Sequence, residues 1–540
     1  MVAVKKMLNQ GYGYALLSGL LLFLSFPEIN LYPLAWIAFV PILYSLSVHE
    51  KVSPFKNGFL MGVVYFFGTT YWIYNSLNKY GGIPLVPSLL IILLLCMYLS
   101  LYPAFFAYFY SSYTRRTDLP SMFIAPVFWT TLEFIRSYAL SGFPWSSIGY
   151  SQYKFLPIIQ IADLTGVYGI SFLVLAVNGA LTDALLFKRR QKERPLASIL
   201  PTFSGFVLLG IFLVGSLGYG FFKMYQHRAG HTVKVAVVQG NIEQDKKWDP
   251  AYQDAVLSTY ENLSMAAAAQ KPDLVIWPET SAPFFFIKNK ALTERLVNFE
   301  RRLNSYLLFG SVLVKEQRPD DLDMKTGRRQ PEAGVKKTEG VGRALSRFLG
   351  YSNSAVLLDK TGNITYIYDK IHLVPFGEYV PLKRLLFFIN KLTVGAGDYI
   401  PGDSYLKAVT PFGSFGTHIC YEIIFPGLVR KFYLKGGDFI VTITNDAWFG
   451  STYGPYQHFS MAVFRAIENR KPLIRAANTG ISGFIDSSGR ILEKTGLFKR
   501  TIAVRDVKTD RTLTPYTKYG DIFSYLCIVC MLLVLIMKRK

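Results

Sequence analysis

Eight long apolar stretches constrain the fold of this chain more than any other feature. A transmembrane helix needs about 20 apolar residues, so most of the stretches qualify, and the first and last are marginal. The chain is 51% hydrophobic and only 17% charged, which is too apolar for an ordinary soluble protein. We therefore predict a polytopic α-helical membrane domain with about eight spans. The stretches are residues 11–26, 31–48, 58–77, 85–110, 122–140, 167–187, 203–222 and 523–537.

The distribution of Lys and Arg predicts the orientation of these spans. If the N-terminus is cytoplasmic, the outer loops hold only Lys79 and Lys154, with Arg136 near a helix end. By the positive-inside rule, both termini are then cytoplasmic and residues 224–519 lie on the outer face. The same distribution explains the net charge of +22, and without a nucleic-acid-binding motif we predict no nucleic-acid partner. The cytoplasmic segments hold Lys5, Lys6, Lys51, Lys56, Arg115, Arg116, Lys188, Arg189, Arg190, Lys192, Arg194, Lys538, Arg539 and Lys540.

The first apolar run follows basic residues, as in a signal peptide. No small-residue cleavage site follows it, and Pro27 leads directly into the next apolar segment. We expect an uncleaved anchor.

The pattern changes at Val233 to short β-branched runs separated by helical or turn segments. This alternation predicts an external α/β domain in which helices cover a sheet. The predicted organisation is a membrane domain of seven helices over 1–223, an external domain over 224–519, and a final helix with a basic tail over 520–540. Predicted strands are 233–238, 273–276, 306–314, 354–358, 364–368, 416–420, 439–444, 474–477 and 483–485, and predicted helices are 251–270, 291–304 and 456–469.

Two segments of the external domain depart from this pattern. Residues 315–346 are rich in charge, Gly and Pro, so we predict a surface insertion without a chemical role. Residues 382–394 (LKRLLFFINKLTV) form a dense apolar cluster between polar loops. This cluster is either part of the core or an interfacial arm whose Lys and Arg meet lipid phosphates, and the sequence leaves both readings open.

Three predicted strands end in residues that carry chemistry: Glu279 in VIWPET, Lys370 in YIYDKIH, and Cys420 in GTHICYE. Loops at strand ends converge on one face of an α/β domain. The other three cysteines, Cys96, Cys527 and Cys530, fall in predicted spans, so Cys420 has no disulfide partner in the external domain. A nucleophilic thiol needs a nearby base or cation, which Glu279 and Lys370 supply.

These three segments, in this order and spacing, resemble the Glu-Lys-Cys triad of the nitrilase (carbon-nitrogen hydrolase) superfamily. The resemblance implies an αββα sandwich in which Glu279 is the general base, Lys370 stabilises an oxyanion, and Cys420 forms a thioester. It also makes Glu378 the second glutamate near the site. The whole chain resembles the apolipoprotein N-acyltransferase family, through QGNIEQDKKW, KIHLVPFGEYVP, CYE, NDAWFG and GFPWSSIGYSQ. Further family positions match Tyr421 and Glu422 as supporting residues, and Trp248 and Trp448 as substrate-binding residues.

The resemblance implies transfer of an acyl chain from a phospholipid, through Cys420, to the N-terminal amine of a diacylglyceryl apolipoprotein. It also implies a bacterial inner-membrane location with the catalytic domain in the periplasm. Because a thioester is converted to an amide, no nucleotide is required, and the chain has neither a P-loop nor a dinucleotide-binding glycine motif. We expect no cofactor, and no cluster with metal-ligand spacing predicts a metal.

Three alternatives remain. A membrane-tethered amidase or nitrilase would use the same residues and let water attack the thioester. A transporter or scaffold would use the charged residues of the spans, namely Glu133, Arg136, Asp163 and Asp183. A Cys-His protease would use His372 or His418, but no orienting Asn or Asp can be assigned to either.

Overall fold

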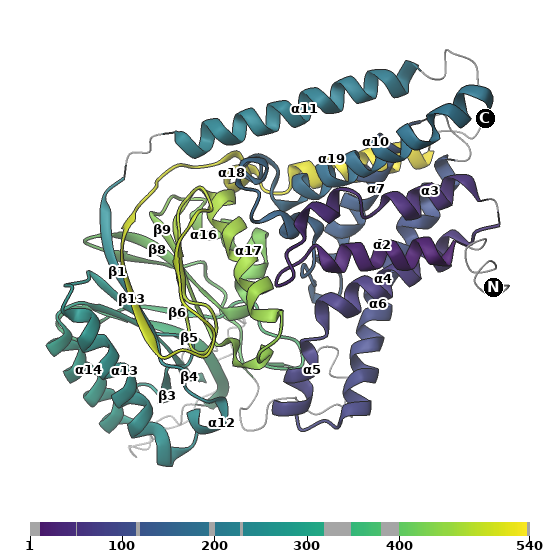
Figure 1. Cartoon of the computed structure of the whole chain (residues 1–540). Coiled ribbons are helices and arrows are strands. Elements are labelled where there is room, and N and C mark those ends of the chain that lie inside the picture. Colours follow the sequence, from purple (N-terminus) through teal and green to yellow (C-terminus); the bar gives the residue numbers. More distant parts are fainter. Residues whose placement is uncertain are drawn as a thin grey trace, which may run out of the picture.

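The computed structural model describes residues 11–49, 51–114, 119–193, 200–226, 230–317, 347–379 and 399–536. A bundle of helices, formed by the first part of the chain and its last helix, packs against a two-sheet domain (Figure 1). The apolar segment 382–394 lies outside the described residues, so neither reading of it is tested. The same holds for 318–346 of the polar insertion.

Eight helices in the described part of the chain carry the apolar stretches. Among the described residues, three are long and apolar enough to cross a membrane, within Leu85–Thr114, Val167–Phe187 and Thr202–Tyr225. The other stretches form helices of 17 residues or fewer, so the prediction of eight spans is not confirmed. The helices are α2 (Tyr12–Leu24), α3 (Val40–Val48), α4 (Pro54–Thr70), α6 (Leu85–Thr114), α7 (Ser121–Arg136), α10 (Val167–Glu193), α11 (Leu200–Tyr225) and α19 (Ile522–Ile536).

The helical region exposes large apolar side chains. Leu94 on α6 is 65% exposed, Val214 on α11 is 71% exposed and Ile536 on α19 is 75% exposed. Water-soluble proteins rarely expose contiguous apolar surface of this kind. The exposed faces of these helices are therefore suited to contact with lipid.

Charged residues of the helical region have structural partners. The Asp183 carboxylate accepts hydrogen bonds from the backbone N–H groups of Ser121 and Met122 at the start of α7. Asp163 forms an ion pair of 2.8 Å with Arg470 of the two-sheet domain. These partners account for two of the residues that a transporter would need and weaken that alternative.

Glu133 and Arg136 of α7 both hold the GFPWSSIGYSQ segment. Glu133 Oε1 accepts from the Ile148 N–H at 2.8 Å. Arg136 donates to the carbonyls of Phe143 and Trp145, at 3.1 and 2.6 Å. Their role in the structure is thus to fix a loop.

Two sheets form the α/β domain, one of seven strands and one of six. The first sheet has the order β13-β1-β2-β4-β5-β6, with β3 beside β4, and the second has the order β12-β11-β10-β9-β8-β7. The central strands β1, β2 and β4 are parallel, as are β8, β9 and β10. The strands are β1 (Thr232–Gln239), β2 (Leu274–Ile276), β3 (Ala282–Phe285), β4 (Tyr306–Gln317), β5 (Arg347–Leu358), β6 (Ile364–Asp369), β7 (Lys407–Thr410), β8 (Gly413–Ile419), β9 (Phe439–Thr444), β10 (Leu473–Ala477), β11 (Gly483–Ile485), β12 (Ile491–Lys494) and β13 (Thr501–Lys508).

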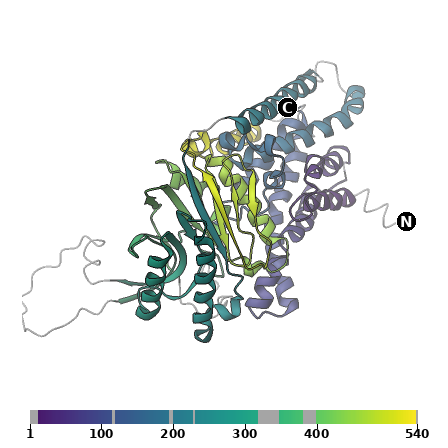
Figure 2. The same ribbon diagram turned by 60° about the vertical axis from the view of Figure 1, so that its left-hand side comes forward.

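Alternate residues of β1 enter two different cores, because successive side chains of a strand point to opposite faces. Val235 and Val237 join a core with residues of the second sheet. Ala236 and Val238 pack with α13 (Gln253–Ala268) and α14 (Lys290–Leu303). Figures 1 and 2 show α13 and α14 on one side of the sheets and α17 (Gly454–Asn469) on the other, toward the helical region. The predicted αββα sandwich is confirmed.

The predicted strands and helices of the external domain are present, but several short elements were not predicted. They include β3, β7, β12, β13 and the helices α12 (Gln244–Lys247), α16 (Pro426–Tyr433) and α18 (Pro515–Tyr519). Two boundaries were wrong: residues 315–317 extend β4, and β5 begins at Arg347, before the predicted start at 354. The reason is that the two strands pair through this stretch, with Lys315 opposite Gly350 and Gln317 opposite Arg347.

Candidate active site

Cys420 lies in a sharp turn where β8 ends. Its φ is +53°, in the left-handed region, and a 3₁₀ turn, Cys420–Ile424, begins at this residue. A non-glycine residue in this region costs of order 1–3 kcal/mol, so the surrounding structure must hold it there. The Cys420 carbonyl accepts a hydrogen bond from His458 Nε2 at 3.1 Å. The side chain is 8% exposed.

The Glu422 carboxylate joins this turn to the loop that follows Lys370. Its Oε2 accepts from the Ile419 N–H at 2.7 Å. Its Oε1 accepts from the Tyr368 hydroxyl and the Ile371 N–H, both at 2.7 Å, and from the N–H of the next residue at 3.1 Å. Burial raises the pKa of Glu422 to about 7. Glu422 therefore connects the Cys420 turn to the loop after Lys370 through hydrogen bonds to both.

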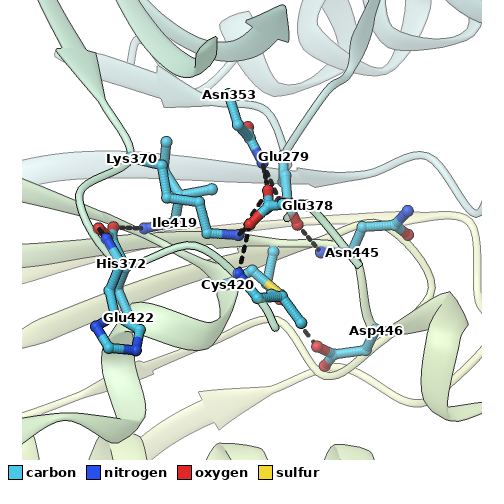
Figure 3. A network of polar contacts seen from close by, with 12 residues as sticks. Glu279, Asn353, Lys370, His372, Glu378, Ile419, Cys420, Glu422, Asn445 and Asp446 are labelled. Carbon is cyan, nitrogen blue, oxygen red and sulfur yellow. Dashed lines mark hydrogen bonds and ion pairs between the residues drawn. The ribbon is translucent and has the colours of Figure 1, made fainter. Parts of the chain in front are cut away.

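Glu279, Lys370 and Glu378 point toward one another beside Cys420 (Figure 3). Lys370 Nζ is 3.7 Å from Glu279 Oε1 and 2.9 Å from Glu378 Oε2. Asn353 of β5 donates to both carboxylates, at 2.7 Å to Glu279 and 2.9 Å to Glu378. The second oxygen of Glu279 accepts from the Asn445 N–H at 3.0 Å. The three residues at predicted strand ends are thus brought together, and Glu378 joins them.

Burial shapes the charges of the site. It raises the pKa of the Cys420 thiol well above its ordinary value, Glu279 adds to this effect, and Lys370 offsets only part of it. Burial alone would lower the pKa of Lys370, but Glu378 and Glu279 outweigh it and raise that pKa. The resting state is therefore a protonated thiol beside a protonated lysine, so a base must remove the thiol proton when the sulfur reacts.

Gly310 of β4 allows the Glu279 turn to approach the sheet. A Cβ atom at this position would lie 2.4 Å from the Thr280 nitrogen and 2.7 Å from the Glu279 Cα. Both are backbone atoms, which cannot rotate away. The absence of a side chain at residue 310 is therefore part of how Glu279 is placed.

We expect Gly310→Ala to displace Glu279 and to destabilise the protein by about 1–3 kcal/mol, the usual range for an overpacked site. The midpoint of thermal unfolding in detergent should fall. Gly496→Ala is the matched control, because a Cβ there meets only the flexible Lys499 side chain, at 3.4 Å. Equal unfolding midpoints for the two variants would contradict this prediction.

The other predicted site residues lie around this cluster. The Tyr421 ring lies 5.1 Å from the Phe425 ring. Trp248 is 36% exposed, near Phe285. The Trp448 carbonyl accepts from Asn75 and Ser76 of the helical region, both at 2.8 Å, and its ring lies 4.9 Å from that of Tyr80. The proposed substrate-binding role of the two tryptophans stays a prediction.

The two histidines of the Cys-His alternative have other surroundings. The His372 ring packs 3.9 Å from the Phe425 ring, and burial lowers the pKa of His372 to about 4. His418 Nδ1 lies 3.3 Å from the Val441 carbonyl, and burial lowers its pKa to about 3. The histidine that does reach Cys420 is His458, and it bonds the backbone carbonyl. This geometry does not support a Cys-His pair.

Several residues of the site carried no role in the sequence reading. Asn353 and Lys247 are buried beside Glu279, and Lys247 Nζ donates to the Glu279 carbonyl at 2.8 Å. Asp446, His458 and Arg475 form a buried polar cluster behind Cys420. Lys247 and Asp446 lie within the motifs QGNIEQDKKW and NDAWFG, which was the available signal. No local pattern marks Asn353.

Comparison with known proteins agrees with this architecture. The sequence matches the apolipoprotein N-acyltransferase N-terminal domain over residues 18–180 and the carbon-nitrogen hydrolase domain over residues 234–514. It is 40% identical to an apolipoprotein N-acyltransferase of Geobacter metallireducens over 528 residues, which cover 96% of this chain and 94% of that protein. It is 32% identical to the Pasteurella multocida enzyme of the same name, over 97% of this chain and 94% of that protein. The chain therefore belongs to the apolipoprotein N-acyltransferase family.

Proposed function

We propose that this protein transfers an acyl chain from a phospholipid to the N-terminal amine of a diacylglyceryl apolipoprotein, through a thioester on Cys420. The observation that carries the proposal is a buried thiol beside the Glu279 and Lys370 pair, in a domain packed onto apolar helices. Family membership supports the choice of substrates.

In the first half-reaction, the Glu279 carboxylate takes the thiol proton as the sulfur attacks the ester carbonyl of the phospholipid. The resulting oxyanion gains stabilisation from the Lys370 ammonium. When the tetrahedral intermediate collapses, the ester C–O bond breaks and Glu279 returns the proton to the leaving alcohol oxygen. The products are a lysophospholipid and the Cys420 thioester.

In the second half-reaction, the α-amine of the apolipoprotein attacks the thioester carbonyl, and Glu279 takes a proton from the attacking nitrogen. The C–S bond breaks, the amide forms, and the proton returns to the Cys420 sulfur. A thioester is higher in free energy than an amide, so the transfer needs no nucleotide and no cofactor.

A series of contacts links Cys420 to the helical region. Trp145 of the GFPWSSIGYSQ segment donates to Gln457 Oε1 of α17 at 2.6 Å, and its ring lies 5.8 Å from that of His458. His458 in turn bonds the Cys420 carbonyl. This chain of contacts supports delivery of lipid substrates from the helical side.

Acyl transfer by the purified protein in detergent tests the proposal. The assay supplies a phospholipid with a labelled acyl chain and a diacylglyceryl lipopeptide with a free α-amine. We expect the label to appear as an amide on the lipopeptide, with release of lysophospholipid. Release of labelled fatty acid at the same rate with and without lipopeptide would instead indicate the amidase or hydrolase alternative.

Reporter fusions test the proposed location, an inner-membrane protein with cytoplasmic termini and a periplasmic catalytic domain. Fusions after Lys56, Arg116 and Arg194 should report the cytoplasm, because basic loops stay inside. Fusions after Lys79 and Lys154 should report the outer side. An inverted pattern would place the catalytic domain in the cytoplasm and contradict the proposed substrates.

A further inference from the structure

Lys247 is a second buried lysine in the site, and the reaction described above does not use it. It ends the short helix α12 (Gln244–Lys247), and its side chain is fully buried. Its Nζ donates to the Glu279 carbonyl at 2.8 Å. Among the described residues, no carboxylate forms an ion pair with it. A buried ammonium without a carboxylate partner is costly, so its place beside the site requires an explanation.

The helix α12 and the segment after β9 hold Glu279 from two sides. Lys247 bonds the backbone carbonyl of Glu279, and the Asn445 N–H bonds its carboxylate. The Asn445 side chain in turn donates to Gln244 of α12. Thr280, the next residue, has a φ of +47°, so the chain turns sharply at this point. Lys247 thus helps to fix the turn from which the Glu279 side chain projects.

The charges of the site leave a place for a second cation. Lys370 lies between the carboxylates of Glu279 and Glu378, so these three groups alone carry one surplus negative charge. That surplus opposes ionisation of the neighbouring thiol and formation of an oxyanion. The Lys247 ammonium reaches these charges at the Glu279 backbone, where its Nζ lies 2.8 Å from the carbonyl oxygen, and Glu279 and Cys420 in turn favour its charged form. Its ammonium brings the sum of the four groups to zero.

We propose that Lys247 is the second cation of the active site, a positioning residue that fixes the Glu279 turn and offsets the surplus negative charge around Cys420. Burial lowers the pKa of Lys247 to about 8, against the opposing effects of Glu279 and Cys420. The charged groups around the Cys420 thiol are Glu279, Lys370 and Asp446. Glu378 lies beside Lys370. The inference rests on the proposed function only in taking Cys420 as the nucleophile.

The pH dependence of Cys420 alkylation tests this role in the full chain in detergent. Iodoacetamide is the probe, and mass spectrometry of the Cys420 peptide separates it from Cys96, Cys527 and Cys530. Removing a nearby opposite charge raises the pKa of an acidic group, by about 1–3 units for the closest partners. Lys247 carries its charge below about pH 8, so in that range we expect Lys247→Met to react about tenfold more slowly than wild type at the same pH, which corresponds to a shift of about 1 pH unit.

Three further variants distinguish the effect of the Lys247 charge from that of its hydrogen bond and from a general loss of charge on α12. Lys247→Gln keeps a donor without the charge and should shift the profile as Lys247→Met does. Lys247→Arg keeps the charge and should lie closer to wild type than either. Lys246→Met is the matched control: it removes the same charge from the same helix, but Lys246 pairs with Glu243 at the surface, and its profile should stay at wild type.

Folded Lys247→Met and Lys247→Gln variants with the wild-type profile would overturn the proposal, and so would a wild-type profile for Lys247→Gln alone. Failure of both neutral variants to fold, judged by thermal unfolding, would make Lys247 a structural residue and would also overturn it. The alkylation assay contains no lipid. A protein that alkylates as expected but transfers no acyl chain would therefore contradict the proposed function and leave the role of Lys247 standing.

Discussion

Cys420→Ala should abolish both half-reactions, with no lysophospholipid released and no amide formed. The reason is that the sulfur forms and breaks the covalent bond in each half, so no other group can replace it. Cys420→Ser should retain at most a trace, because a hydroxyl is far harder to ionise than a thiol. The measurement is acyl transfer from labelled phospholipid by purified variants in detergent.

Cys530→Ala is the matched control for this experiment. Cys530 is exposed on α19, away from the polar network of the site. We expect this variant to keep the activity of the wild type. Near-normal acyl transfer by Cys420→Ala would show that Cys420 is not the nucleophile.

Glu279→Gln should slow formation of the acyl-enzyme by about 100 to 10,000-fold, the usual contribution of a positioned acid-base group. The thiol is protonated at rest, because burial raises the pKa of Cys420, so the loss of the base leaves the proton without an acceptor. The rate is best measured in a single turnover, as release of lysophospholipid before any acceptor is added.

The amide that replaces the carboxylate in Glu279→Gln would also face two donors, Asn353 and the Asn445 N–H, so thermal unfolding should be measured in parallel. Glu294→Gln, an exposed position on α14, is the matched control for the change of charge. A folded Glu279→Gln variant with an acylation rate within a few-fold of wild type would exclude Glu279 as the base.

The sequence predicted the parts of the fold that depend on local pattern. Alternation of β-branched runs with helical segments identified the central strands, because buried parallel strands need apolar residues along their length. The edge strands β7, β12 and β13 were missed for the opposite reason, although the edge strand β6 was predicted. The strand β13 is half exposed, and it is defined by pairing with β1, more than 260 residues earlier in the chain. Such non-local pairing leaves little local signal.

Site residues that directly follow a strand could be predicted from the sequence. Residues that reach the site only through the pairing register of two strands could not. Glu279, Lys370 and Cys420 each follow a recognisable strand. Asn353 lies inside β5, and it meets the site only because antiparallel pairing places it beside Lys370, whose N–H donates to the Asn353 carbonyl at 2.8 Å. Lys247 was missed because a lysine in a charged segment is usually solvated, and its burial follows from the packing of α12 onto the Glu279 turn.

The number of spans was the weakest prediction, because apolar composition does not fix helix length. The stretch at 31–48 divides into a 3₁₀ turn, Tyr32–Trp36, and the short helix α3. Pro33 and Pro41 lie in the first turns of these two elements, where a missing N–H is tolerated. Prolines placed in this way start new helices and break a continuous apolar stretch into shorter ones.

The most direct test of acyl transfer through Cys420 is the mass of the Cys420 peptide from protein incubated with phospholipid and no acceptor. We predict that the Cys420 peptide gains the mass of one fatty acyl chain and that hydroxylamine removes this mass. Added diacylglyceryl lipopeptide should return the peptide to its free mass while the lipopeptide becomes acylated. An unmodified Cys420 in protein that still transfers acyl chains would contradict the thioester mechanism.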